Sequence, residues 1–202
     1  MKKVFLTAVV AVMTVVSMNA QTSFGVKAGV NFADIKGDFE NNSSLTSFHI
    51  GGVVEFKLSD KFSLQPELLF SAQGTKLEES EDVYSYESKI KFNYLNIPVI
   101  AKYYVMEGLS LEFGPQLGIL LSADVDSTIS INGKVDETDK MDVKEFIEDI
   151  DFGVNFGASY QLENNLFFQA RYNLGLVNVS KDSDDAEMKN SVFQLSVGYK
   201  FN

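Results

Sequence analysis

The single histidine of the chain, His49, is the first candidate for catalysis. A hydrolytic or acyl-transfer site needs a nucleophile beside a base, most often a serine beside a histidine, and the candidate neighbours are Ser47 and Ser71. The sequence contains no Gly-x-Ser-x-Gly turn and no glycine-rich phosphate-binding loop. No pattern marks a third residue that would orient the imidazole. We therefore interpret His49 as a polar core residue, and keep a hydrolase or acyltransferase that uses it as the alternative.

Two clusters of aspartate offer the oxygen ligands that hard divalent cations prefer. They are Asp182, Asp184 and Asp185, and the pair Asp124 and Asp126. Neither has the spacing of an EF-hand calcium loop, so we interpret both as solvated acidic segments, with weak divalent-cation binding as the alternative. The chain has no cysteine, which excludes disulfides, thiol nucleophiles and thiolate metal sites. No cofactor is predicted.

A third set of charged side chains lies within apolar, alternating segments rather than between them. It contains five bases and three acids: Lys27, Glu55, Lys57, Glu67, Lys102, Glu112, Arg171 and Lys200. Charges removed from water must be paired or hydrated, so these residues are expected to pair across one shared interior. Amide side chains at similar positions can complete such a charge network: Gln65, Gln116, Asn155, Gln169 and Gln194.

The segments that carry this set are predicted to be β-strands, because apolar residues recur at every second position in eight of them. Their apolar sets begin at Phe24, Phe48, Phe62, Leu95, Leu109, Phe152, Leu166 and Phe193. Tight turns are expected at 59–61, 106–108 and 163–165, and long loops at 35–47, 75–89, 123–150 and 179–190. This layout is typical of an all-β fold, an eight-stranded antiparallel up-and-down transmembrane β-barrel with both termini at the short-turn end.

Bulk and glycine content decide which set of side chains faces the interior. An eight-stranded ring encloses just enough room for side chains or one small ligand, and the apolar sets supply too many Phe, Leu and Tyr residues to fit there. The opposite set is rich in glycine, which makes room in a crowded interior. The apolar set is therefore predicted to face lipid, and the charged set to fill a polar, plugged interior. The reverse arrangement, a soluble ligand-carrying barrel, is disfavoured.

Prolines and aromatic residues add two further expectations. Pro66, Pro98 and Pro115 lie inside predicted strands, where proline cannot donate to the ladder, so local distortions are expected. Aromatic residues near the strand ends indicate two interfacial girdles. The girdle toward the long loops contains Phe32, Phe48, Phe70, Phe92, Phe152 and Phe193, and the girdle toward the short turns contains Phe56, Phe62, Tyr103, Tyr160, Phe168 and Tyr199.

The N-terminus and the charge balance bear on location and partners. Lys2 and Lys3 precede an apolar run at 4–16 that is too short to span a membrane comfortably, and Ala20 suits a cleavage site. Residues 1–20 are therefore predicted to be a signal peptide, and residues 21–202 the barrel domain. The net charge of −11, without a basic patch, argues against nucleic acid as a partner.

Five short motifs, in order, resemble a known family. They are FGVKAGVNF at 24–32, LQPELLFS at 64–71, YLNIP at 94–98, GPQLG at 114–118 and VGYKF at 197–201. Together they are similar to the PorT-like outer-membrane β-barrel proteins common in Bacteroidota, which are OmpA/OmpX-like eight-stranded barrels. The resemblance covers the whole predicted barrel domain and includes all three prolines. It implies an outer-membrane location but no single activity; some members take part in secretion-system assembly.

The combined prediction is a non-enzymatic outer-membrane barrel whose function lies in its long acidic loops. Segment 123–150 alone contains nine acids and three bases. We expect surface binding or adhesion, or a role in envelope integrity, rather than transport, because long charged side chains obstruct so narrow a lumen. The expected partners are outer-membrane lipid and lipopolysaccharide, and an extracellular ligand or envelope protein at the loops; the barrel is expected to be a monomer. The alternatives are a lipid-modifying enzyme that uses His49 and a secretion-system assembly component.

Overall fold

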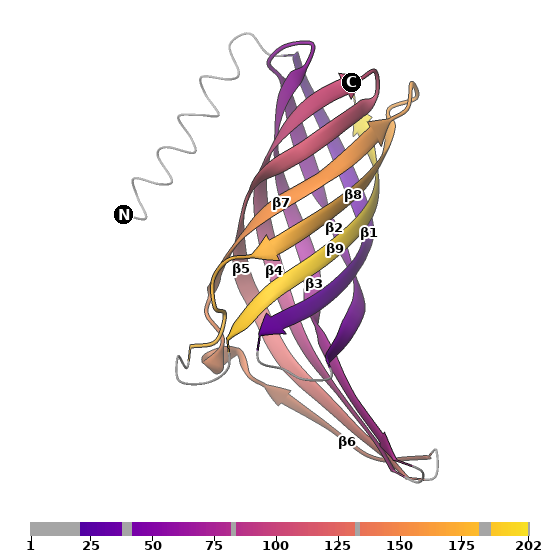
Figure 1. The fold of residues 1–202 in the computed structure, drawn as a ribbon, viewed down its shortest axis with the longest axis vertical. Helices are drawn as coiled ribbons and strands as arrows, with labels where there is room; N and C mark the ends of the chain where they lie inside the picture. Colours follow the sequence, from indigo (N-terminus) through magenta and orange to yellow (C-terminus); the bar gives the residue numbers. More distant parts are fainter. Residues whose placement is uncertain (1–20, 38–41, 82–83, 132–133, 182–186, 202) are drawn as a thin grey trace.

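A computed structural model describes residues 21–37, 42–81, 84–131, 134–181 and 187–201. These residues form an antiparallel sheet of nine strands with one short 3-10 helix (Figure 1). The elements are β1 (Gln21–Gly37), β2 (Asn42–Lys57), β3 (Phe62–Glu81), β4 (Tyr84–Met106), β5 (Leu109–Ile131), β6 (Lys134–Asp142), η1 (Lys144–Phe146), β7 (Ile150–Gln161), β8 (Leu166–Gly175) and β9 (Met188–Phe201). The predicted signal peptide, residues 1–20, lies outside the described residues and stays a prediction. Within the described ranges, no helix is both long and apolar enough to cross a membrane.

Eight of the strands close into a ring. Their order is β1-β2-β3-β4-β5-β7-β8-β9, and β9 pairs back onto β1. The predicted eight-stranded antiparallel barrel is therefore confirmed. The tight turns and the two ends of the barrel domain meet at one end of the ring, where Gln21, Asp60, Gly108, Asn164 and Lys200 line an open hollow of about 1160 Å³.

The outer surface of the ring is apolar, as predicted. Phe24, Phe113 and Phe168 are 58%, 62% and 52% exposed, while the side chains that alternate with them point inward and are mostly buried and polar. So large an exposed apolar surface suits a hydrocarbon surrounding. Phe56, which was expected to face lipid, differs from the other outward residues because only 9% of it is exposed.

The three prolines interrupt the ladder without shifting its register. Each lies in or next to a two-residue gap in the pairing: Pro66 between β2 and β3, Pro98 between β3 and β4, and Pro115 between β4 and β5. The pairing on both sides of each gap keeps the same register. The predicted distortions are thus local losses of hydrogen bonds, because proline has no N–H to donate.

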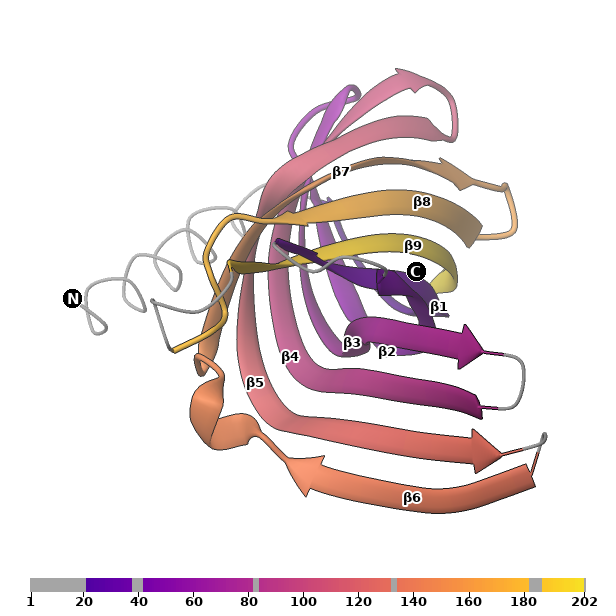
Figure 2. The same ribbon diagram turned by 60° about the horizontal axis from the view of Figure 1, so that its bottom comes forward.

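Three of the predicted loops, 35–47, 75–89 and 123–150, are largely strands where the structure describes them. β3, β4 and β5 continue beyond the ring, and β6 pairs with the far side of β5. Residues 75–81, 84–91, 124–131 and 134–142 form a four-stranded extension, here called the projecting sheet, which leaves the ring to one side (Figures 1 and 2). The expectation of loops was wrong because β-branched residues such as Ile90, Val125 and Ile129 favour strands, and the long hairpins satisfy each other's backbone groups.

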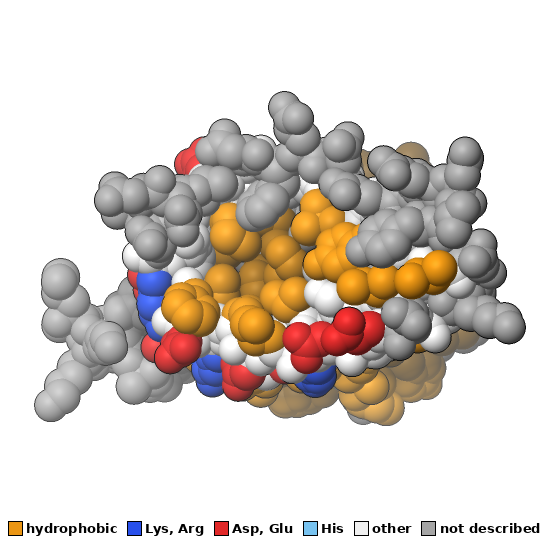
Figure 3. Space-filling model, turned by 90° about the horizontal axis from the view of Figure 1, so that it is seen from below, with side chains coloured by type: hydrophobic (Ala, Val, Ile, Leu, Met, Phe, Trp, Pro, Cys, Tyr) orange, Lys and Arg blue, Asp and Glu red, His pale blue; other side chains and the backbone are white. Residues whose placement is uncertain are grey.

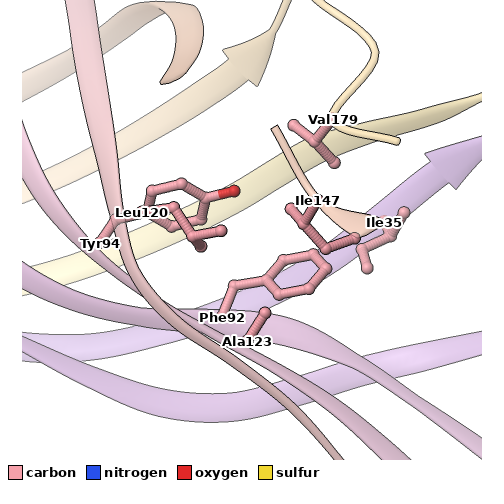
Figure 4. Close-up of a cluster of buried hydrophobic side chains, with 7 residues drawn as sticks. All are labelled: Ile35, Phe92, Tyr94, Leu120, Ala123, Ile147 and Val179. Carbon is pink, nitrogen blue, oxygen red and sulfur yellow. The ribbon is translucent and has the colours of Figure 1, made fainter. Parts of the chain in front are cut away.

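A cluster of buried apolar side chains closes the lumen at the base of the projecting sheet (Figure 4). This apolar plug consists of Ile35, Phe92, Tyr94, Leu120, Ala123, Ile147 and Val179. The segments that carry Ile147 and Val179 are joined by a hydrogen bond from the Glu148 amide to the Val179 carbonyl. Phe92 was expected in a lipid-facing girdle, but it is fully buried because it shares the inward face of β4 with Tyr94.

Candidate functional site

Arg171, in β8, lies at the centre of the buried charges. Its guanidinium donates to Glu67 at 2.9 and 2.8 Å and to Glu112 at 2.8 Å. The Lys27 ammonium pairs with Glu67 at 2.7 Å and donates to Gln169 at 2.7 Å. The side chains of these four charged residues are 0% exposed. Such charge-assisted hydrogen bonds compensate for the cost of removing the charges from water.

A second group of charges lies nearer the short-turn end and is joined to the first. Glu55 pairs with Lys200, accepts a hydrogen bond from the Tyr104 hydroxyl, and has the Lys102 ammonium 3.6 Å away. Lys102 also lies 3.6 Å from Glu112, which belongs to the first group. Tyr104 was not predicted to take part, although it occupies the inward position two residues after Lys102 on β4.

Lys57 lies outside the network, contrary to the prediction. Its side chain is 46% exposed, and its ammonium pairs with Asp60 at 3.6 Å in the turn that follows β2. β2 ends at Lys57, so this position already faces the open hollow. The structure brings together the other seven predicted charges: Lys27, Glu55, Glu67, Lys102, Glu112, Arg171 and Lys200.

His49 is fully buried, and both of its ring nitrogens have partners. Nδ1 lies 2.8 Å from the Asn31 side-chain oxygen, and Nε2 lies 2.8 Å from the Ser196 hydroxyl. The Asn31 amide nitrogen donates to the Phe48 carbonyl and the Ser71 hydroxyl, which leaves its oxygen for the imidazole. Nδ1 therefore carries the proton, and Nε2 accepts from Ser196.

The serine beside His49 is not one of the two expected. Ser47 donates to the Ala72 carbonyl, and Ser71 contacts Asn31 rather than the imidazole. Ser196 reaches His49 because Gly29 pairs with both residues where the first strand joins the last. The order Asn–His–Ser is that of a hydrolytic triad, but the imidazole is 0% exposed and lies away from the open hollow. The arrangement fixes side chains without giving a substrate access.

Of the aspartates considered as cation ligands, the two that the structure describes pair with lysines. Asp124 pairs with Lys140 at 3.4 Å, and Asp126 pairs with Lys91 at 2.5 Å. The second cluster, Asp182, Asp184 and Asp185, lies outside the described residues. Among the described residues, no three His, Asp or Glu side chains are placed to hold a metal ion.

The projecting sheet has two faces of opposite character. Its apolar face continues the inner wall of the barrel and carries Leu77, Tyr86, Ile90, Val125, Ile129, Ile131 and Met141. Ile90 packs against the apolar plug, and the Tyr86 hydroxyl lies 3.2 Å from the Ser127 hydroxyl on the same face. From this end of the molecule, apolar side chains gather in a hollowed centre, with acidic and basic groups along its lower side (Figure 3).

The charged face of the projecting sheet continues the outer wall of the barrel. Its ion pairs join Lys76 to Glu78 and Glu87, Lys89 to Glu87, Lys91 to Asp126 and Lys140 to Asp124. Hydrogen bonds from Lys76 and Lys89 hold the pKa of the Glu87 carboxyl below its usual value. A hydrogen bond from Lys91 does the same for the pKa of Asp126. The polarity of the two walls is thus reversed where the sheet leaves the ring.

A family model described as "Outer membrane protein beta-barrel domain" matches residues 19–181 of the chain. This range includes β1 to β8 and the projecting sheet. No curated protein sequence matches the chain.

Several solved structures are similar to this chain. The attachment invasion locus protein Ail of Yersinia pestis is 15% identical, with a TM-score of 0.46; the match covers 91% of this chain and 100% of that one. Neisserial surface protein A is 13% identical, with a TM-score of 0.47, and the match covers 91% and 99% of the two chains. The N-terminal barrel domain of Pseudomonas aeruginosa OprF is 16% identical, with a TM-score of 0.39 and coverage of 91% and 100%.

Proposed function

The chain belongs to the outer membrane protein beta-barrel domain family, and from this premise we propose that it is a surface-binding protein without enzymatic activity. The barrel lies in the outer membrane. The long-loop end, with the projecting sheet, would then face the outside of the cell, as in other barrels with short periplasmic turns.

The projecting sheet is the observation that carries this proposal. Four paired strands leave the ring, and each continues for about seven residues or more, which corresponds to roughly 25 Å of extended chain. A sheet of this kind holds its side chains in fixed positions, unlike a solvated loop. Among the described residues β6 pairs only with β5, so its outer edge is open to a partner strand.

The closed lumen supports binding rather than transport or catalysis. The network around Arg171 fills the middle of the barrel, and the apolar plug closes its outer end. His49, the residue of the enzymatic alternative, is sealed between Asn31 and Ser196. Neither feature gives a solute or a lipid a path to the interior.

The same proposal includes the narrower family, the signal peptide and the oligomeric state. We assign the chain to the PorT-like group on its five motifs, with residues 1–20 removed on export and residues 21–202 forming the mature barrel domain. The barrel would act as a monomer surrounded by outer-membrane lipid, with lipopolysaccharide near the charged face. A role in secretion-system assembly is the alternative that this group implies.

Trimming the projecting sheet tests the proposal. Val125 and Met141 face each other on β5 and β6, so residues 126–140 can be replaced by an Asn-Gly turn without changing the ring. We expect cells that carry this variant to lose adhesion to protein-coated surfaces, while the barrel keeps its heat-modifiable gel mobility. Unchanged adhesion together with increased sensitivity to detergent would contradict surface binding and point to envelope integrity.

A further inference from the structure

The apolar face of the projecting sheet is exposed outside the membrane-spanning ring. Met141 is 57% exposed and Ile131 is 42% exposed, and Ile90, Val125 and Ile129 are only partly buried. Apolar side chains form two rows outward from the apolar plug, Ile90 with Val125 and Met141, and Tyr86 with Ile129. The Ser88 and Ser127 hydroxyls lie between the rows. Apolar side chains gathered on one face in water mark a place where another molecule binds.

Carboxylates lie along the margin of this apolar face. Glu137 and Asp139 are on β6, opposite Ile129 and Ser127, and therefore on the same face of the sheet. Both side chains are exposed. Glu137 and Asp139 are called the acidic margin. The segment that follows β6 carries three more exposed acids, Glu145, Glu148 and Asp149, of which Glu145 and Asp149 line a small pocket with Asp142, Lys144 and Lys181.

The described lysines near the acidic margin have other partners. The Lys140 ammonium pairs with Asp124 on the opposite, charged face. The Lys144 ammonium donates to the Leu121 carbonyl, and the Lys181 ammonium donates to the Glu145 carbonyl. Among the described side chains, none forms an ion pair with an acid of the margin. The two carboxylates of the acidic margin are therefore free to meet an incoming cation.

We propose that the apolar face binds a cationic amphipathic peptide segment. Its apolar side would lie on Val125, Ile129 and Met141, and its lysines or arginines would reach the acidic margin, as when an amphipathic helix fills a groove. This inference rests on the proposed function, because it names the class of partner that the projecting sheet takes.

Charge decides between this partner and other occupants. A second copy of the chain would bring the same acidic margin against itself, and like charges across an interface are unfavourable. Anionic lipid phosphates would meet the same repulsion. A neutral acyl chain would cover the apolar floor but leave Glu137 and Asp139 without a cation. A cationic amphipathic segment satisfies both the floor and the margin.

The test uses the full mature chain in nanodiscs of zwitterionic lipid and a labelled helical probe peptide. The probe has about twelve residues, with leucine along one face of the helix and lysine elsewhere. The matched control peptide has glutamate in place of lysine. We expect the lysine probe to bind at least about ten-fold more tightly by fluorescence anisotropy, after subtraction of empty nanodiscs. Raising the salt from about 50 mM to about 1 M should weaken this binding. Equal binding of the two probes would overturn the inference.

Variants locate the binding surface. The double variant Glu137→Gln/Asp139→Asn should bind the lysine probe about ten-fold more weakly, and Ile129→Ser should weaken it by removing part of the floor. The matched control is Glu107→Gln/Glu163→Gln, which removes the same charge at the short-turn end, next to the open hollow. If this control weakened binding equally, the attraction would be to net charge and the inference would fail.

Two further outcomes separate this inference from its alternatives. A dimer in detergent that Ile129→Ser dissociates would identify a second copy as the occupant and overturn the inference. If trimming residues 126–140 abolished cell adhesion while the lysine probe never bound, the peptide assignment would be wrong and the surface-binding function would stand. If the probe bound but adhesion did not depend on the sheet, the proposed function would fail instead.

Discussion

Arg171 holds two carboxylates that would otherwise repel each other in the middle of the barrel. Glu67 and Glu112 both accept from its guanidinium, whose planar fork can serve two carboxylates at once. Each glutamate also has a lysine, Lys27 beside Glu67 and Lys102 beside Glu112. The network therefore depends on one residue more than on any other.

We predict that Arg171→Met is strongly destabilising. Removing one partner of a buried ion pair costs about 3–5 kcal/mol, because the remaining charge stays buried without full compensation. Urea unfolding in detergent micelles, followed by circular dichroism, measures the change. Lys57→Met is the control: Lys57 is exposed, so its loss should change the unfolding free energy by less than about 0.5 kcal/mol. Equal effects would show that the network does not hold the barrel together.

His49 provides a second prediction at this scale. His49→Ala removes the hydrogen bonds to Asn31 and Ser196 and leaves a cavity, so it should destabilise the barrel by about 2–4 kcal/mol. Ser47→Ala, which loses one hydrogen bond to a carbonyl, should cost about 1 kcal/mol. Mass spectra of lipid A from cells with either variant should be unchanged. A change specific to His49→Ala would restore the enzymatic alternative.

Among the elements, β4 and β5 lie close together beside Pro98 and Pro115. A Cβ added to Gly114 would lie 2.0 Å from the Val99 carbonyl oxygen, a backbone atom that cannot move away cheaply. Val99 follows Pro98, and Gly114 precedes Pro115, so this glycine lies at the gap in the ladder. Because Gly114 has no Cβ, β5 can lie this close to the Val99 carbonyl of β4 even where the pairing is interrupted.

Gly114→Ala is therefore expected to weaken the barrel by about 1–3 kcal/mol, the usual cost of overpacking. The matched control is Gly52→Ala, because a Cβ there would meet nothing nearer than the Gly25 carbonyl oxygen at 3.9 Å. The temperature at which each variant loses its heat-modifiable gel mobility compares the two. If Gly52→Ala melted as early as Gly114→Ala, close approach would not be the cause.

The charged face predicts how the projecting sheet responds to acid. Hydrogen bonds from lysine hold the pKa of Glu87 below its usual 4.5 and the pKa of Asp126 below its usual 3.8. A carboxyl with a depressed pKa adds stability that is complete above its usual pKa and is lost as the pH falls through the lowered one. Amide exchange protection in β4 and β5, corrected for intrinsic rates, should therefore be constant from pH 7 to about 5 and fall below that. The loss of protection at low pH should be smaller in Glu87→Gln than in the unchanged protein. Protection that stays the same at low pH as at pH 7 in the unchanged protein would contradict this account.

At the scale of the whole molecule, the wall of the barrel was predictable and its outer end was not. Alternation with period two places Lys27, Glu67 and Arg171 on one wall whatever their partners are. The position of Ser196 beside His49 was not predictable, because it depends on the closure of β9 onto β1. The apolar plug was not predictable either, because no local sequence pattern links Ile147 to Val179. The projecting sheet was missed because an acid-rich segment carries a strand only when a neighbouring hairpin supplies its hydrogen bonds.

The two seals of the lumen act in series, which leads to a prediction about conduction. The intact barrel should give no current steps in planar bilayers, because the apolar plug and the network around Arg171 each block the path. Phe92→Ala/Ile147→Ala opens only the plug, and Lys102→Ala/Arg171→Ala opens only the network, so neither variant should conduct. The variant with all four changes should give steps, provided that its heat-modifiable mobility shows a folded barrel. Current steps from the intact protein would contradict the closed lumen, and steps from a single-seal variant would show that the other seal does not exclude ions.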